Sequence, residues 1–146
     1  MTAADKIRPM VPDDLQTVAE IWLTANTDAH TFIPAQYWQS NYEPVKYQLA
    51  QAEIYLYETA GSIQGFIGLT GCYIAGIFVK KRARSHGIGT ALLHHTKTLK
   101  PALTLSVYEK NTAAIRFYQQ EGFQIQSRDT DPAVNETEFH MTWSRP

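Results

Sequence analysis

The stretch 79–90 is the feature that most restricts how this 146-residue chain can fold. A short apolar run, 75–79, leads into it, and a helical pattern of apolar residues, 91–99, leads out of it. Between them lie several cations and two glycines, Gly87 and Gly89, separated by one residue. Glycines allow close approach of a ligand to the backbone, and a helix start offers unpaired N–H groups to an anion. The stretch therefore predicts a strand, turn and helix that together bind phosphate or pyrophosphate.

Two common nucleotide-binding loops are excluded by the residues that follow the glycines. Gly89 is followed by Thr90 rather than by lysine, so the GxxxxGK[ST] loop is absent. The third glycine of a dinucleotide GxGxxG loop would stand at position 92, which is Leu92. On this pattern alone, a solvated basic turn remains the alternative. For Lys80, Lys81 and Arg82, each taken singly, a side chain exposed to solvent in such a turn is the expected state.

Two patterns in the chain resemble the signatures of the GNAT acyltransferase superfamily. Arg84, Gly87 and Gly89 form R-x-x-G-x-G, which resembles the pyrophosphate loop of that superfamily. Residues 111–123 read N-x-x-A-x-x-F-Y-x-x-x-G-F, which resembles its second signature. Both stand in the family's order, with a strand candidate, 103–107, between them.

The resemblance covers residues 7–143 and is especially strong to small bacterial peptidyl-lysine N-acetyltransferases, because 29–33 and 37–38 also look similar. It implies one domain, 1–146, with an α/β (α+β) fold whose mixed, mostly antiparallel central sheet is flanked by helices. The implied activity is direct transfer of an acetyl group from acetyl-CoA to a primary amine, on a protein lysine or a small molecule, without a metal. A non-catalytic acyl-CoA-binding or sensing module is the alternative.

Hydrophobic periodicity and turn residues predict the same order of elements from the residues themselves. Gly76 suggests a bulge or a close backbone approach within 72–79, which is expected to be a central strand buried on both faces. Strands are expected at 6–8, 53–57, 62–68, 72–79, 103–107, 123–126 and 138–143. Helices are expected from 12, from 34 with a break at 43–44, at 45–50, 90–99 and 111–121, and loops at 26–33 and 129–136.

The resemblance also implies which residues contact the cosubstrate. The expected cofactor-binding residues are Ile77, Phe78, Val79, Arg84, Ser85, His86, Gly87, Ile88, Gly89, Thr90, Asn111, Ala114 and Tyr118. His86 also fits an exposed loop histidine. Tyr118 is the expected catalytic residue, donating a proton to the departing thiolate of CoA. Asn111 and Tyr118 are seven residues apart, so they share one face of a helix.

The general base is left open by the sequence. A lysine of pKa about 10.4 must lose a proton before it can attack, which costs roughly 4–5 kcal/mol at pH 7. Many family members carry a glutamate on the central strand for this purpose, but 72–79 contains no carboxylate. The candidates are His30, Tyr73 and Glu109. An α-amine, with a pKa near 8, would lose its proton at a smaller cost in free energy, so N-terminal acetylation also stays open.

The acceptor pocket is expected to come from aromatic residues of the variable first third of the chain and from the central strand. The candidates are His30, Phe32, Tyr37, Trp38 and Tyr73, although single aromatics in a helix also fit core packing.

The composition is typical of a globular protein whose overall charge favours no particular kind of partner. The net charge is −1 and 44% of residues are hydrophobic, so neither nucleic acid nor a membrane is an expected partner. The single cysteine, Cys72, excludes an internal disulfide and is expected to be a small buried hydrophobe. Without an apolar leader, the expected location is the cytoplasm, as a monomer or a homodimer.

Overall fold

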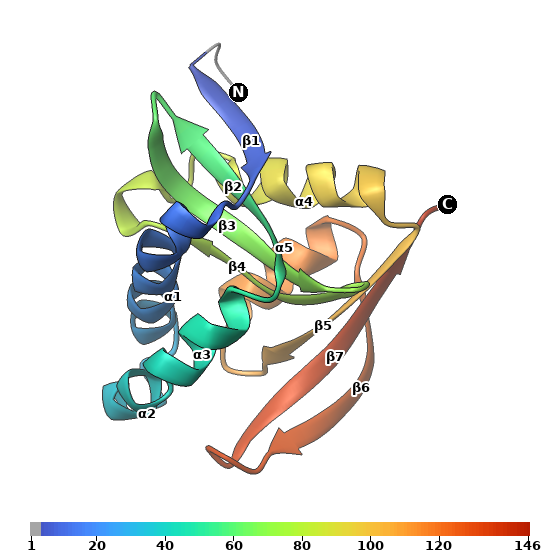
Figure 1. Ribbon diagram of the computed structural model, residues 1–146. Helices are drawn as coiled ribbons and strands as arrows, with labels where there is room; N and C mark the ends of the chain where they lie inside the picture. The colour runs from blue at the N-terminus through green and yellow to red at the C-terminus, as the bar shows by residue number, and fades with distance from the viewer. Residues whose placement is uncertain (1–3) are drawn as a thin grey trace.

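The computed structural model describes residues 4–146, which form a seven-stranded sheet flanked by helices (Figure 1). The strand order is β1-β2-β3-β4-β5-β7-β6, and every neighbouring pair is antiparallel except β4 and β5. The mixed, mostly antiparallel sheet predicted from the sequence is confirmed. The strands are β1 (Asp5–Pro9), β2 (Glu53–Thr59), β3 (Ser62–Thr70), β4 (Tyr73–Val79), β5 (Ala102–Tyr108), β6 (Gln124–Asp131) and β7 (Glu136–Ser144).

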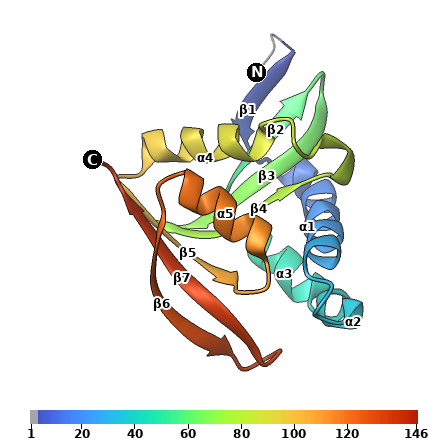
Figure 2. The same ribbon diagram turned by 180° about the vertical axis from the view of Figure 1, so that it is seen from behind.

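Helices cover both faces of this sheet. The helices are α1 (Leu15–Ala29), α2 (Ala35–Ser40), α3 (Tyr42–Leu49), α4 (Ile88–Leu99) and α5 (Thr112–Gln120), with short 3-10 turns at Pro12–Asp14 and Lys81–Ala83. Figures 1 and 2 show α1, α2 and α3 on one side and α4 and α5 on the other. Within residues 4–146, no helix is both long enough and apolar enough to span a membrane.

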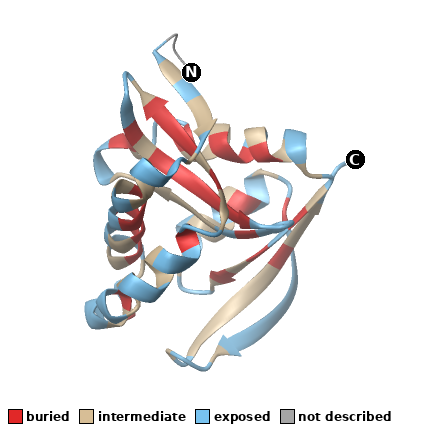
Figure 3. Cartoon of the chain, in the orientation of Figure 1, coloured by how far each residue is buried: buried red, intermediate tan, exposed pale blue. Residues whose placement is uncertain are grey.

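Alternation along the strands divides the interior into two cores. Phe66 and Ile67 are neighbours on β3, both fully buried, yet Phe66 packs with α1 and α2 whereas Ile67 packs with α4. Successive side chains of a strand point to opposite faces, so one apolar run supplies both layers. Figure 3 shows the buried residues concentrated along β2 and β3 and on the inner sides of the helices.

The central strands β4 and β5 separate along their length. They pair only through Tyr73 with Thr104 and Ile74 with Leu105. Beyond Ile74, the side of β4 that would face β5 is left open. The prediction that 72–79 is buried on both faces was therefore wrong: Tyr73 and Ala75 are exposed, and 76–79 are only partly buried.

Gly76 lies in this open part of β4, where the sequence suggested a close approach. A Cβ at this position would collide with the ring of Phe78, which folds back over the glycine. The register of β3 against β4 also shifts next to the Gly68–Gly76 pair. The glycine thus makes room for an aromatic ring at the edge of the opening.

Several element boundaries differ from the predictions. The loop expected at 26–33 begins later, because α1 continues to Ala29 and Asn26 is buried with its side-chain amide donating to the Trp22 carbonyl at 2.9 Å. The helix break lies at Asn41 rather than at 43–44. Pro44 fits inside the first turn of α3, where a missing N–H breaks no helical hydrogen bond.

Two further expectations about loops were wrong. The polar loop expected at 129–136 shrinks to 132–135, because β6 and β7 pair as far as Asp131 and Glu136. Cys72 is exposed rather than buried, since it lies in the turn between β3 and β4. Apolar character alone does not reveal where a strand leaves the core.

Candidate active site

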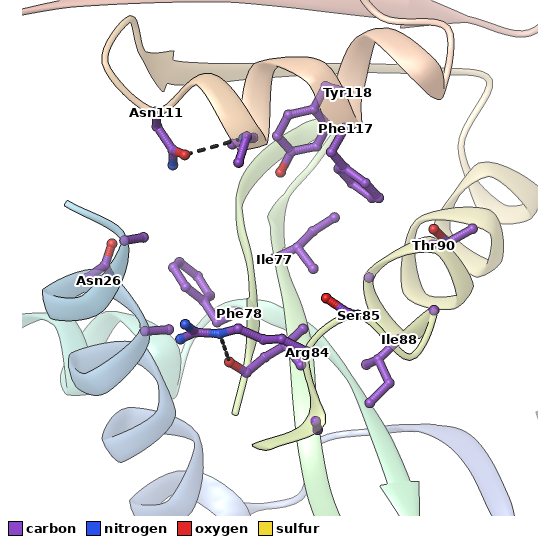
Figure 4. A pocket seen from close by; sticks show the side chains of 18 of the residues that line it. Asn26, Ile77, Phe78, Arg84, Ser85, Ile88, Thr90, Asn111, Phe117 and Tyr118 are labelled. Carbon is purple, nitrogen blue, oxygen red and sulfur yellow. Dashed lines mark hydrogen bonds between the residues drawn. The ribbon is translucent and has the colours of Figure 1, made fainter. Parts of the chain in front are cut away.

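A cavity of about 600 Å³ opens where β4 separates from β5 (Figure 4). Its walls come from α1, from the second half of β4, from the turn before α4 and from α5. The lining residues are Ala25, Asn26, Ala29, His30, Ile77, Phe78, Val79, Ala83, Arg84, Ser85, Gly87, Ile88, Gly89, Thr90, Asn111, Ala113, Ala114, Phe117 and Tyr118. The apolar strand, the glycine turn and the second motif helix therefore share one cavity, although they are far apart in the sequence.

The turn before α4 presents backbone donors to this cavity. Gly87 is the N-cap of α4 and has a left-handed backbone (φ 78°), and Ser85 has φ 65°. The first N–H groups of a helix have no partner within the helix, and the positive end of the helix dipole there favours an anion. The first three residues of α4, Ile88, Gly89 and Thr90, all line the cavity.

Arg84 adds a positive charge that is held in place from two sides. Its Nε donates to the Val79 carbonyl at 3.2 Å, and its Nη2 lies 3.6 Å from Oδ2 of Asp28 on α1. The guanidinium is partly exposed, so the pair with Asp28 contributes little stability. Figure 4 shows the Arg84 side chain crossing the cavity beside Phe78.

Helix α5 forms the opposite wall. Asn111 is its N-cap, as predicted, because its Oδ1 accepts from the Ala114 N–H at 3.3 Å (Figure 4). Tyr118 lies two turns further along and is buried. Burial, with Tyr73 nearby, raises the pKa of Tyr118 well above its usual value. Within residues 4–146 no hydrogen bond reaches its hydroxyl, so this phenol is a protonated donor without a partner.

A second cavity, of about 270 Å³, adjoins the first. The two share seven lining residues: Asn26, His30, Ile77, Phe78, Asn111, Ala114 and Tyr118. The second cavity adds residues from α1, α2, β4, β5 and β7: Trp22, Trp38, Tyr73, Ala75, Gly76, Ser106, Val107, Tyr108 and Glu138. Tyr118 thus stands where the cavity lined by Arg84 and the start of α4 meets a cavity lined by aromatic residues.

His30 lies at the junction of the two compartments. Its Nε2 is 3.2 Å from Nδ2 of Asn111, and its ring stacks on Trp38 at 5.3 Å. Because Asn111 Oδ1 already accepts from the Ala114 N–H, the amide Nδ2 must donate and Nε2 must accept. The proton of the neutral ring is therefore on Nδ1, which is buried and unpartnered. Burial lowers the pKa of His30, which keeps the ring neutral.

Four of the candidate cofactor-binding, acceptor-binding and general-base residues lie outside both cavities. Phe32 packs edge-on against His30, and Tyr37 packs edge-on against Trp38. His86 is exposed, with Nδ1 3.2 Å from the Ala83 carbonyl. Glu109 is exposed at the end of β5. The remaining expected residues line one or both cavities.

The polar side chains that β5 and β7 contribute were missed by the sequence analysis. Leu103, Leu105 and Val107 of β5 are buried toward α4 and α5, so the alternate positions Ser106 and Tyr108 face the other side. On β7, Glu138 is the register partner of Tyr108. The period-two alternation in 103–107 indicated which way Ser106 faces. The strand register that places Glu138 opposite Tyr108 is not visible in the sequence.

Comparisons with known proteins decide what kind of molecule has this site. A family model described as "Acetyltransferase (GNAT) domain" matches residues 50–125. The chain belongs to the GNAT acetyltransferase family. The peptidyl-lysine N-acetyltransferase YiaC of Escherichia coli K12 is 38% identical over 82% of this chain and 83% of that protein. The peptidyl-lysine N-acetyltransferase YjaB of Salmonella typhimurium LT2 is 32% identical over 84% of this chain and 85% of that protein.

Solved structures show the same GNAT fold. The solution structure of apo-form YjaB from Escherichia coli superposes with a TM-score of 0.84 at 24% identity, over 97% of each chain. The PaiA N-acetyltransferase of Thermoplasma acidophilum, in complex with coenzyme A, superposes with a TM-score of 0.83 at 19% identity, over 99% of this chain and 100% of that one.

The predicted activity follows from family membership. This GNAT protein is an acetyl-CoA-dependent N-acetyltransferase that moves an acetyl group to an amine. The absence of a carboxylate on 72–79 had motivated the alternative of a non-catalytic acyl-CoA-binding module. Similarity to two named acetyltransferases favours the enzyme.

Proposed function

We propose that this GNAT enzyme acetylates the side-chain amine of lysine in a protein or peptide, by direct transfer from acetyl-CoA. The observation that carries the proposal is the meeting of the two compartments at Tyr118, one lined by N–H donors and Arg84 and the other by aromatic rings. The two relatives described above are both named for peptidyl-lysine acetylation, which supports the same acceptor.

The larger cavity fits the chemistry of acetyl-CoA. Its diphosphate needs several donors and a positive charge, which the start of α4 and Arg84 provide. Its slender arm needs an apolar channel, which Ile77, Ala114 and Phe117 provide beside the unpaired backbone of β4. Those unpaired backbone groups of β4 are free to hydrogen-bond the amides of the arm.

Tyr118 is the residue we assign to the chemical step. Acetyl-CoA supplies the reactive thioester. The amine nitrogen forms a bond to the acetyl carbonyl carbon, the C–S bond breaks, and the Tyr118 hydroxyl gives its proton to the thiolate. The amide nitrogen loses one proton, which returns to the Tyr118 oxygen. A phenol whose pKa is raised by burial stays protonated until the thiolate develops.

The smaller cavity is the path we assign to the acceptor. Trp38 and Tyr73 lie along it, and aromatic faces suit both the methylene stem and the cationic end of a lysine. His30 is shared with the larger cavity and positions Asn111 rather than acting as a base, because its one lone pair faces that amide. Phe32 and Tyr37 support this wall from outside through His30 and Trp38.

The wider setting also belongs to the proposal. We infer that residues 1–146 act as one domain in the cytoplasm, as a monomer or a homodimer. A single cysteine fits a reducing compartment.

Isothermal titration with acetyl-CoA, followed by a peptide assay, tests this function. Three versions of one peptide are compared: a blocked N-terminus with a single lysine, the same peptide with arginine in place of lysine, and the arginine peptide with a free N-terminus. We expect acetyl-CoA binding and transfer to the lysine peptide alone. Transfer only to the free α-amine, or only to small amines such as polyamines, would contradict the proposed acceptor.

A further inference from the structure

Glu138 is the one carboxylic acid among the described residues that line the two cavities. It stands on β7, opposite Tyr108 of β5, and reaches the smaller cavity together with Tyr73 and Tyr118. Its strand joins the sheet on the far side of β5 from β4. The carboxylate that 72–79 lacks is therefore present in the acceptor compartment, but it comes from another strand.

The carboxylate of Glu138 is not engaged by any other side chain or backbone group of the part of the chain that the structure describes. Within residues 4–146, no hydrogen bond or ion pair is made by its side chain, which is partly buried. Burial raises the pKa of Glu138, the nearby Asp131 and Asp129 raise it further, and His140 acts in the opposite direction. An unpaired, partly desolvated carboxylate binds a cation or a proton more readily than a solvated one.

The surroundings of Glu138 come from four elements. Tyr108 of β5 is its register partner, Tyr37 of α2 interacts with it electrostatically, and the Tyr108 hydroxyl donates to Asp131 of β6 at 2.9 Å. His140, on the same strand, is engaged with Ser106, whose Oγ is 2.8 Å from its Nδ1. Three of these neighbours, Tyr108, Asp131 and His140, thus have hydrogen-bond partners, whereas the Glu138 side chain has none within residues 4–146. The electrostatic groups around it are Tyr37, Tyr108, Asp129, Asp131 and His140.

Three other residues of the two cavities that could accept a proton, His30, Tyr108 and Tyr118, are unsuited to the task. The Nε2 lone pair of His30 faces the Asn111 amide, and the proton on Nδ1 is enclosed. Burial raises the pKa values of Tyr108 and Tyr118, so both remain phenols at neutral pH. Glu109 lies outside both cavities.

We propose that Glu138 receives the ammonium of the acceptor in the smaller cavity and removes its proton before acetyl transfer. One N–H bond of the ammonium breaks and one O–H bond forms on the carboxylate, which leaves a neutral amine with a free lone pair. The proton on Glu138 then passes to solvent, so the carboxylate is restored after each turnover. This step rests on the proposed function, because it assumes that the acceptor enters through the smaller cavity.

A glutamine at this position tests the assignment. Glu138→Gln keeps the shape of the side chain and removes the proton acceptor. Glu136→Gln is the control, because it removes the same charge two residues away on the same face of β7 but outside both cavities. The rate constant kcat/KM is measured with the lysine peptide between about pH 7 and pH 9.5. Acetyl-CoA affinity is measured by titration for every variant.

We expect Glu138→Gln to lower kcat/KM about 100-fold at pH 7, which is within the range for a general base. The deficit should shrink toward high pH, because the neutral fraction of lysine, of pKa about 10.4, rises tenfold per pH unit. Glu138→Asp should recover part of the rate, Glu136→Gln should match the wild type, and acetyl-CoA affinity should stay within about twofold in all three. A merely structural role would not give a deficit that closes with pH.

Three results would overturn the role of Glu138. They are an unchanged rate in Glu138→Gln, a deficit of the same size at every pH, and equal rates for the Asp and Gln variants. Failure of the proposed acceptor gives a different pattern. If a small amine is the true acceptor and its transfer shows the same dependence on Glu138, the lysine assignment falls and the role of Glu138 stands.

Discussion

His30 and Asn111 are joined by a hydrogen bond of 3.2 Å between Nε2 and Nδ2, across 81 residues of sequence. His30 is the C-cap of α1, and Asn111 is the N-cap of α5. The end of one helix thus orients the residue that begins the other, and both residues line both cavities. This contact therefore joins two residues of the wall that the two cavities share.

Loss of the cap should destabilise the protein. We expect Asn111→Ala to lower the free energy of unfolding by about 1 kcal/mol, because the Ala114 N–H loses its acceptor. Asn111→Asp keeps a capping oxygen but cannot donate to His30, so it should keep most of the stability and lose acetyl-CoA affinity. Urea unfolding and titration measure the two effects, and equal stability of the Ala and Asp variants would contradict the capping role.

Stability should fall in mild acid because of His30. Burial lowers its pKa below 6.5, so between the folded and unfolded pKa values the unfolded chain binds more protons. The free energy of unfolding therefore rises with pH in that window and declines as pH drops below 6.5. In His30→Gln, we expect a shallower decline between about pH 7.5 and pH 5.5 in urea unfolding. Identical slopes for the two proteins would exclude His30 as the source.

Tyr118→Phe should separate chemistry from binding. Removing the hydroxyl leaves the ring in the core, so we expect turnover to fall about tenfold or more while acetyl-CoA affinity is nearly unchanged. Tyr55→Phe, which removes a hydroxyl that bonds Glu53 outside both cavities, serves as the control and should keep wild-type turnover. Wild-type turnover in Tyr118→Phe would remove this phenol from the mechanism.

Arg84→Lys should weaken acetyl-CoA binding although the charge is kept. Lysine cannot reproduce the bond to the Val79 carbonyl together with a planar contact to a diphosphate, so we expect the Kd to rise about tenfold. Asp28→Asn removes the anion that competes for the guanidinium and should bind at least as tightly as the wild type. Titration at low and high salt checks both, and an unchanged Kd in Arg84→Lys would argue against a direct contact.

Gly87 provides a test of the turn itself. Its φ of 78° is left-handed, and a Cβ there meets no neighbour within 4 Å, so strain alone sets the effect of substitution. We expect Gly87→Ala to lower the free energy of unfolding by about 1–2 kcal/mol. Gly87→Asn should lose less, because asparagine tolerates this conformation and caps helices well. Thermal unfolding ranks the stabilities of the three proteins. Equal stability of Gly87→Ala and the wild type would mean that the turn relaxes to relieve the strain.

The sequence by itself determined the elements and the two motifs. Helix and strand periodicity, the glycine turn and the Asn111 cap depend on residues a few positions apart, so short-range patterns were enough to predict them. The resemblance to the GNAT superfamily implied most of the residues that line the larger cavity. The ends of the helices were predicted less accurately, because α1 continues through 26–29 and the helix break lies at Asn41. The predicted burial of Cys72 was also wrong. Where an element ends depends on what it packs against.

The tertiary structure alone revealed which residues of β5 and β7 line the smaller cavity. The separation of β4 from β5, the contact between His30 and Asn111, and the position of Glu138 all join segments that are distant in sequence. Each depends on strand register and helix placement, which are set by packing of the whole chain and leave no local pattern. The cosubstrate could therefore be inferred from the sequence, whereas the carboxylate we assign to the acceptor amine became visible only in the folded molecule.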